Sequence, residues 1–205
     1  MKKNFLIWFN MALILLDIIG LVVCYGEKGF GLFVYYTQLS NTVALLSSIC
    51  LVICLLKDKY PKWIRIFRHM SASVVSVTFV VVVFVLAPIN TDGYMDSFLG
   101  GSSLYHHTIC PIMMFISYVF LEKGETLRLK DVSIALIPTV AYAVVMIILN
   151  TLKMVYGPYP FLKVYEQSVY VSVIWTIAII GLAYILALFI WFISEKINKK
   201  SSIRK

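Results

Sequence analysis

The sequence predicts an all-α polytopic membrane protein with six transmembrane helices, and its composition and hydropathy pattern lead to this class. The chain has 205 residues, of which 61% are hydrophobic, and its mean hydropathy is +0.90. Its apolar residues form long runs instead of the amphipathic stripe of a soluble helix bundle. About 20 apolar residues cross the bilayer core as a helix. We therefore expect a single domain, residues 1–205, with helices near 5–24, 33–56, 70–88, 104–121, 132–152 and 169–193.

The connections between the runs also carry information. The first run follows basic residues, as a secretory signal does, but it is longer than such a signal and no small-x-small cleavage site follows it, so we expect a helix of the mature protein. Residues 57–68 contain Pro61 and five basic residues, which predicts a turn at the lipid headgroups. Residues 89–103 end in Gly-Gly-Ser-Ser, typical of a flexible turn before a helix. Residues 155–167 are rich in proline and aromatics, and we expect them to cap the outer mouth of the bundle.

Basic residues gather on one side of the predicted topology. When the six runs alternate in direction, 15 of the 18 Lys and Arg residues lie on the side of the termini, and only Lys28, Lys153 and Lys163 lie on the other. Cytoplasmic loops retain Lys and Arg during insertion, so both termini are predicted to be cytoplasmic. The same asymmetry accounts for the net charge of +8, and no nucleic-acid partner is expected.

Two polar clusters interrupt the apolar runs. Residues 36–41 (YTQLSN) lie near the start of the second run, and residues 105–108 (YHHT) lie at the start of the fourth. Polar groups in hydrocarbon usually face a bundle interior, a cavity or a partner. From the helix rise we place Thr37 roughly 6 to 9 Å below the outer surface, and His106 and His107 roughly 3 to 6 Å below it. Both clusters therefore belong to the same outer region of the membrane.

Further polar residues are predicted near this region. Asp17 in the first run lies about 18 Å from the cytoplasmic end, and Thr78 in the third lies near the midplane by the same count. An isolated carboxylate in lipid must be paired or neutral, so Asp17 can orient a histidine, carry a proton or bond to a neighbouring helix. Thr78 more simply bonds to a carbonyl of its own helix or contacts another helix.

The two clusters together contain a nucleophile and a base. A hydroxyl nucleophile needs a group that accepts its proton, and histidine is the usual one. Thr37 and a histidine of the fourth run supply both, and only one of His106 and His107 is expected to face the cavity, since they point about 100° apart on an α-helix. A structural alternative remains, in which Thr37 bonds to its own helix and the histidines anchor at the interface.

Other chemistries fit the sequence less well. A zinc site needs three or four ligands, and His69 is predicted a membrane thickness away from the histidine pair, so no metal is expected. An intramembrane serine protease would take its histidine from a helix after Gly101 and Ser102, yet the chain has no histidine after His107. The cysteines are expected to be small packing residues, with a Cys24–Cys110 disulfide as the alternative.

Three motifs carry a family resemblance: YYTQLSN opening the second run, LYHHTICP opening the fourth, and VYGPYPFL before the sixth. In these motifs and their order, which span most of the chain, it resembles the androgen-induced membrane hydrolase family. These small six-helix proteins include the androgen-dependent regulator of tissue factor pathway inhibitor and short bacterial integral membrane relatives. After Pro111, the residues MMFISYVFLE depart from the Asp-Trp pair of many bacterial relatives.

The resemblance implies a threonine nucleophile and a histidine that cleave fatty acid esters of hydroxy fatty acids within the outer membrane layer, without a cofactor. Carried onto this sequence, the nucleophile is Thr37. The histidine is His107 if it precedes Pro111 by four residues and His106 if by five, and we prefer His107. The family's polar position after the threonine corresponds to Asn41, and its aromatic cap to residues 159–161.

The leading hypothesis from the sequence is thus an intramembrane lipid-ester hydrolase of the cell membrane, expected in the bacterial cytoplasmic membrane. A developing oxyanion is stabilised by hydrogen-bond donors that are already in place. The candidate donors are Asn41, Gln38 and Tyr159. The alternative is a non-enzymatic small transporter or lipid-binding protein in which Asp17 and His107 pair as a proton or ligand site.

Overall fold

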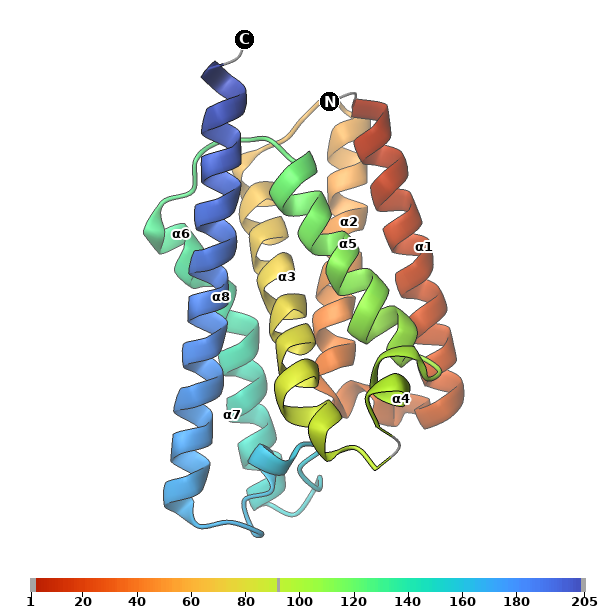
Figure 1. Ribbon diagram of the computed structural model, residues 1–205, viewed down its shortest axis with the longest axis vertical. Helices are drawn as coiled ribbons and strands as arrows, with labels where there is room; N and C mark the ends of the chain where they lie inside the picture. Colours follow the sequence, from red (N-terminus) through yellow and green to blue (C-terminus); the bar gives the residue numbers. More distant parts are fainter. Residues whose placement is uncertain (1–2, 92, 204–205) are drawn as a thin grey trace.

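The computed structural model describes residues 3–91 and 93–203, and these residues form helices without any strand. Six helical stretches are long and apolar enough to cross a membrane, which confirms the predicted all-α polytopic class. The two described ends of the chain, at Lys3 and Ile203, lie at the same end of the bundle (Figure 1). The spans are Lys3–Val34, Tyr36–Leu56, Lys62–Ile89, Leu104–Leu121, Leu129–Thr151 and Val169–Lys199.

Several spans combine more than one helix type. The 3₁₀ turn η1 follows α1, π-helical segments occur as η2, η4 and η5, and the fifth span contains α6, η6 and α7. The bounds in chain order are α1 Lys3–Lys28, η1 Gly29–Val34, α2 Tyr36–Leu56, α3 Lys62–Val81, η2 Val82–Leu86, η3 Ala87–Ile89, α4 Gly93–Leu99, η4 Leu104–Ile109, α5 Cys110–Ile116, η5 Ser117–Leu121, α6 Leu129–Ser133, η6 Ile134–Leu136, α7 Ile137–Thr151, η7 Pro160–Leu162 and α8 Val169–Ile203.

Helix α3 begins earlier than the sequence suggested, so the prediction of a headgroup loop as far as residue 68 is wrong. Pro61 occupies the N-cap position with an extended backbone, and the helix starts at Lys62. Arg65 and Arg68 are therefore part of the helix and are fully buried. Their charges are balanced by Glu195 of the sixth span, at 2.9 Å from Arg65, and by Glu122, which directly follows the fourth span and lies 2.6 Å from Arg68.

Arg68 joins several helices near the terminal end of the bundle. It donates to Glu122 from Nε at 2.9 Å and from Nη2 at 2.6 Å. It also donates to Asn10 of α1, Ser48 of α2 and Ser117 of η5 at 2.7 to 2.9 Å. A buried guanidinium is tolerated only when it is paired and its donors are satisfied. The network therefore explains how an arginine can lie inside the bundle.

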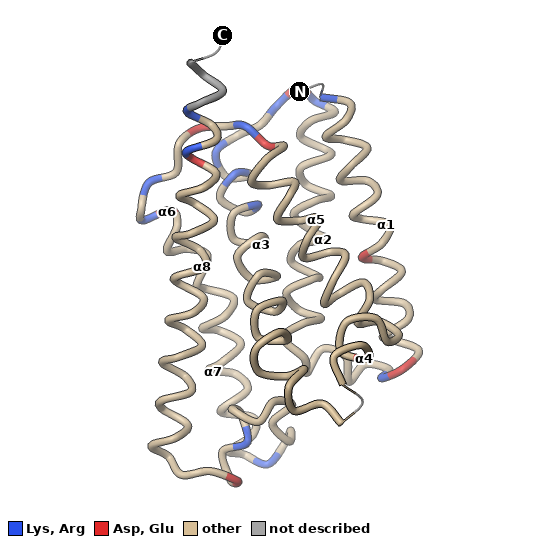
Figure 2. Tube along the Cα trace, viewed as in Figure 1, with Lys and Arg blue, Asp and Glu red and all other residues tan. Residues whose placement is uncertain are grey.

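Basic side chains gather at the end of the bundle where the described chain begins and ends, and few lie at the other end (Figure 2). Of the residues assigned to this basic side from the sequence, Lys2, Arg204 and Lys205 lie outside the described residues, as does the side chain of Lys200. An even number of spans places both ends of the chain on one side, and the basic residues gather on that side. The cytoplasmic position of this end follows from the basic residues alone and stays a prediction.

Two prolines shape the helices at the opposite end of the bundle. In η4 the Cys110 N–H donates to the Tyr105 carbonyl five residues earlier, and the next residue is Pro111, which has no N–H. In η2 the Ala87 N–H donates to the Val82 carbonyl, and Pro88 follows. The π-helical turns change which side chains face the bundle interior, and such turns are frequent at functional sites. Both segments border the cavities described next.

Candidate functional site

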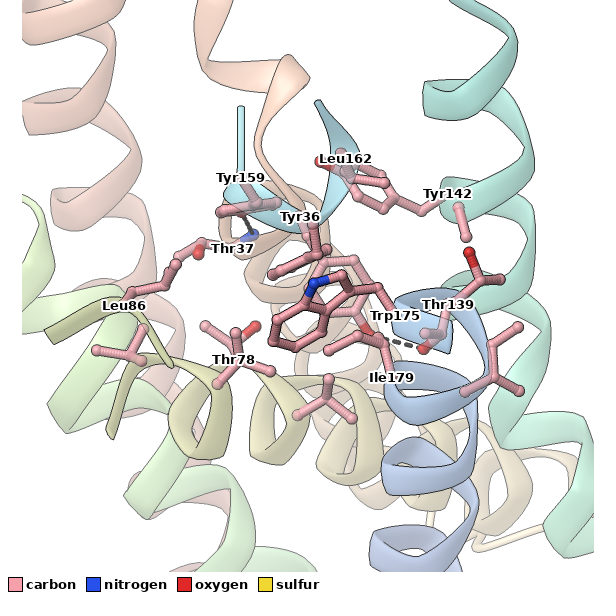
Figure 3. Close-up of a pocket in the computed structure, with 17 residues that line it drawn as sticks. Tyr36, Thr37, Thr78, Leu86, Thr139, Tyr142, Tyr159, Leu162, Trp175 and Ile179 are labelled. Carbon is pink, nitrogen blue, oxygen red and sulfur yellow. Dashed lines mark hydrogen bonds between the residues drawn. The ribbon is translucent and has the colours of Figure 1, made fainter. Parts of the chain in front are cut away.

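Two hollows meet at Thr37. One is an open cavity of about 620 Å³ at the end of the bundle away from the described termini, which we call the outer cavity. The other is a narrow, mostly apolar space of about 40 Å³ among α2, α3, α7 and α8, which we call the crevice (Figure 3). The residues that line both are Thr37, Val82, Leu86 and Tyr159. Thr37 therefore lies at the boundary between a polar and an apolar compartment.

Thr37 lies in the first turn of α2, where backbone N–H groups have no partner within the helix. The N-cap residue, Tyr35, makes no side-chain capping hydrogen bond. The Thr37 N–H instead donates to the Tyr159 hydroxyl at 3.4 Å (Figure 3). Burial raises the pKa of Tyr159, while hydrogen bonding to Thr37 acts in the opposite direction. Tyr159 therefore keeps its proton and remains a hydrogen-bond donor beside the threonine.

The Tyr159 ring is held by the segment between α7 and α8. It stacks on Phe161 with ring centroids 5.2 Å apart and meets Tyr35 edge-on at 6.4 Å. Pro158 and Pro160, on either side of it, line the outer cavity. This segment thus borders the cavity, as we expected from its proline and aromatic content, and it brings Tyr159 to α2 from far away in the sequence.

His107 lines the outer cavity together with Thr37. Its Nδ1 lies 2.7 Å from the Ser97 carbonyl oxygen. A carbonyl oxygen can only accept a hydrogen bond, so Nδ1 carries the proton and the neutral ring has its lone pair on Nε2. The ring is therefore oriented by a partner on α4 and has the tautomer that a base acting through Nε2 requires.

His106 faces a different neighbour. It is fully buried, and its Nε2 lies 3.2 Å from Asp17 Oδ1 and 3.3 Å from the Asp17 backbone oxygen. Gly20 makes this approach possible, since a side chain there would overlap the imidazole. Asp17 therefore pairs with His106, and not with His107 as the alternative hypothesis from the sequence expected. Neither cavity described above is lined by His106.

The remaining candidates divide between the cavities and the protein interior. Gln38 is buried and lines the outer cavity beside Thr37, so it stays in reach of a ligand there. Thr78 lines the crevice, and its hydroxyl lies 2.8 Å from that of Ser40. Asn41 is fully buried, and its amide donates to the backbone of Thr37 at 2.8 Å and of His106 at 3.1 Å. Its donors are thus already occupied, which argues against an oxyanion role for Asn41.

Sequence reasoning missed several parts of the site. Ser97, whose carbonyl orients His107, lies in a stretch read as a turn, and a backbone acceptor leaves no sequence signal. The far side of the crevice is formed by Thr139 and Tyr142 of α7 (Figure 3). The Thr139 hydroxyl lies 2.7 Å from that of Tyr36. A threonine in the fifth apolar run was the only available hint of this contact.

The described residues contain no group of three His, Cys, Asp or Glu side chains arranged to hold a metal ion. Cys24 and Cys110 are both buried and free, so the alternative of a disulfide between them is wrong. Comparisons with protein-family models, with characterised proteins and with solved structures find no match for this chain. The arguments for a function therefore come from the residues and their geometry.

Proposed function

We propose that this protein is an intramembrane lipid-ester hydrolase in which Thr37 is the nucleophile and His107 the general base. The observation that carries the proposal is the position of Thr37, which lines both a polar cavity containing His107 and an apolar crevice. An ester between an acyl chain and a polar alcohol has its carbonyl at such a boundary. Burial of the chain would therefore place the bond to be cleaved next to the threonine hydroxyl.

The chemistry follows from the tautomer of His107. Its Nε2 would accept the proton as the Thr37 hydroxyl attacks the carbonyl, with the Ser97 carbonyl in the orienting role that a third group plays in hydrolase triads. The alcohol would leave with that proton, and an acyl group would remain on Thr37. The same nitrogen would then take a proton from a water molecule of the outer cavity as this water attacks the acyl carbonyl. The bond to Thr37 would break, the proton would return to the Thr37 oxygen, and the acid would leave.

A developing oxyanion needs donors that are already in place. Tyr159 has its hydroxyl beside Thr37. Gln38 adds an amide on the wall of the outer cavity. These two side chains are the oxyanion donors in this proposal.

The substrate class follows from the two compartments. In this proposal the acyl chain would enter between the apolar side chains that line the crevice, such as Val77, Val81 and Ile179, and the helices around it would move apart to admit the chain, because a space of about 40 Å³ is too small for it. The outer cavity would take the polar part, and it contains charges of both signs, Glu27, Lys28 and Asp96. Fatty acid esters of hydroxy fatty acids, implied by the family resemblance, and other acyl esters with a polar alcohol portion are the compounds to test. The membrane of residence is proposed to be the bacterial cytoplasmic membrane.

The test is ester turnover by the detergent-purified protein with a panel of long-chain esters of hydroxy acids, glycerol and p-nitrophenol. Thr37→Ala and His107→Ala are expected to lower kcat on the order of 1,000-fold or more. Thr42→Ala is the matched control, since Thr42 lies on the same helix and its hydroxyl donates to the Gln38 carbonyl four residues earlier. Undiminished turnover of every hydrolysed ester by both site variants would refute the proposal.

One observation favours the second candidate, a small proton-coupled transporter or lipid-binding protein. Asp17 and His106 form a fully buried ionisable pair, and buried ionisable residues in membrane spans often mark proton pathways. This function predicts proton uptake with a solute in liposomes, abolished by Asp17→Asn, and no ester hydrolysis. Measuring both activities in one preparation separates the two candidates.

A further inference from the structure

Asn41 joins the two halves of the proposed site through their backbones. One N–H of its amide donates to the Thr37 carbonyl at 2.8 Å, and the other to the His106 carbonyl at 3.1 Å. The first acceptor belongs to the proposed nucleophile, and the second to the residue before the proposed base. Asn41 is fully buried, so neither bond competes with water.

The His106 carbonyl is available because of Pro111. In the π-helical register of η4, the Cys110 N–H donates to the Tyr105 carbonyl, and residue 111 would donate to that of His106. Proline has no N–H, so this bond cannot form. A buried carbonyl without a donor is unfavourable, and the Asn41 amide supplies the donor from the neighbouring helix.

The imidazole of the same residue is held from the opposite side. His106 Nε2 approaches Asp17 on α1, where Gly20 leaves room for the ring. The backbone at this position is therefore fixed between α1 and α2, and the His107 side chain projects from it into the outer cavity.

We propose that Asn41 is a positioning residue, which sets the separation and orientation of the Thr37 hydroxyl and the His107 imidazole by tying their backbones together. This inference rests on the proposed function. It extends that function to a residue that lines neither cavity and so acts through the positions of Thr37 and His107. The physical reason is the steep dependence of proton transfer and attack on geometry, where a displacement of about 1 Å can lower the rate on the order of 100-fold.

The first experiment measures steady-state kinetics for Asn41→Leu and Asn41→Asp. Leucine has a similar size and no donor, while a carboxyl group has one donor if protonated and none if ionised. We expect kcat to fall roughly 10- to 100-fold in both variants with KM changed less than about twofold, since the substrate-lining side chains remain. Ser73→Ala is the control, because the buried Ser73 also donates to the carbonyl four residues earlier and lines neither cavity. Its kcat should equal that of the unmodified protein.

The second experiment does not depend on enzymatic activity. Pro111→Ala introduces an N–H that can donate to the His106 carbonyl, so it should reduce the loss that Asn41→Leu causes. We expect Asn41→Leu to lower the melting temperature by roughly 2 to 4 °C less in the Pro111→Ala background than in the unmodified protein. If Asn41→Leu does not fold, the same cycle is measured with Asn41→Asp.

The two experiments separate the possible failures. A stability coupling together with an unchanged kcat would show that Asn41 is only structural and would overturn the proposal. If Asn41→Leu lowers the melting temperature equally with and without Pro111→Ala, Asn41 does not replace the missing Pro111 donor. This result would also overturn the proposal. Full activity of Thr37→Ala would instead refute the hydrolase itself, whatever the Asn41 variants do.

Discussion

His107 Nδ1 lies 2.7 Å from the carbonyl oxygen of Ser97, so the imidazole is oriented by a backbone acceptor instead of a carboxylate. The bond fixes the tautomer with a lone pair on Nε2. Because the Ser97 side chain takes no part in this hydrogen bond, a substitution of Ser97 that keeps the backbone should preserve it. The first prediction uses that property.

We predict that Ser97→Ala retains kcat within about threefold, whereas His107→Gln lowers it on the order of 100- to 10,000-fold. In the unmodified protein turnover should fall on acidification, because a protonated imidazole has no lone pair to accept the threonine proton. Rate profiles against pH for the three proteins test this. Retention of the acid limb in the residual activity of His107→Gln would assign that limb to another group.

Tyr159→Phe removes the hydroxyl beside the Thr37 N–H and should lower kcat roughly 10- to 100-fold with little change in KM, if this hydroxyl stabilises the oxyanion. Since burial raises the pKa of Tyr159, its contribution should not change with pH below about 10. Tyr156→Phe is the matched control, because Tyr156 lies in the same segment and its exposed hydroxyl bonds to Glu166. Equal kcat for both variants would remove Tyr159 from the mechanism.

Ala143→Phe places a bulky side chain in the crevice and should discriminate between substrates by chain length. We expect kcat/KM for long-chain p-nitrophenyl esters to fall at least about tenfold relative to the butyryl ester, since a filled pocket excludes the distal methylenes. Val144→Phe is the control, because the neighbouring Val144 of α7 is half-exposed. It should leave the kcat/KM for long-chain esters relative to the butyryl ester unchanged. A uniform loss for all chain lengths would indicate that acyl chains bind elsewhere.

Gly20→Ala should destabilise the protein by about 1 to 3 kcal/mol, because a Cβ at this position overlaps His106 and one helix must move away. Gly26→Ala on the same helix meets nothing within 4 Å and should leave stability unchanged or slightly raised, since alanine favours helix. Thermal unfolding in detergent compares the two variants. Equal melting temperatures would show that α1 and η4 are not tightly packed here.

Glu122→Gln leaves the Arg68 guanidinium buried without its counter-charge and should destabilise the fold by about 3 to 5 kcal/mol. The double variant Arg68→Met with Glu122→Gln should be more stable than the single one, because it removes the buried charge altogether. Lys3→Ala breaks an exposed ion pair with Asp58 and should have no measurable effect. Unfolding curves of the three variants decide between these outcomes.

Hydropathy located the spans well because insertion into lipid acts on each segment separately, so a run of apolar residues is sufficient evidence for a helix. The start of the third span was an exception. Arg65 and Arg68 read as loop residues, since arginine is seldom buried. Their burial depends on Glu195 and Glu122, which lie in other parts of the sequence.

The candidate site was predicted in part. The polar clusters around Thr37 and His107 indicated where to look, since polar groups inside apolar runs require a partner or a cavity. Their sequence did not indicate which histidine faces which neighbour. An α-helical wheel assumes 100° per residue, whereas the π-helical turn before Pro111 changes that angle. The wheel therefore could not assign Asp17 to His106.

What the sequence by itself determined is the membrane architecture and the chemical types present, because hydrophobic burial and residue identity are local properties of the chain. Only the tertiary structure decided how these residues meet: Thr37 between a cavity and a crevice, Ser97 behind His107, and Asn41 bridging two backbones. The physical reason is that hydrogen bonds and cavities depend on the distances and angles between helices. Side-chain packing and proline-induced turns set these quantities, and neither can be read from one segment alone.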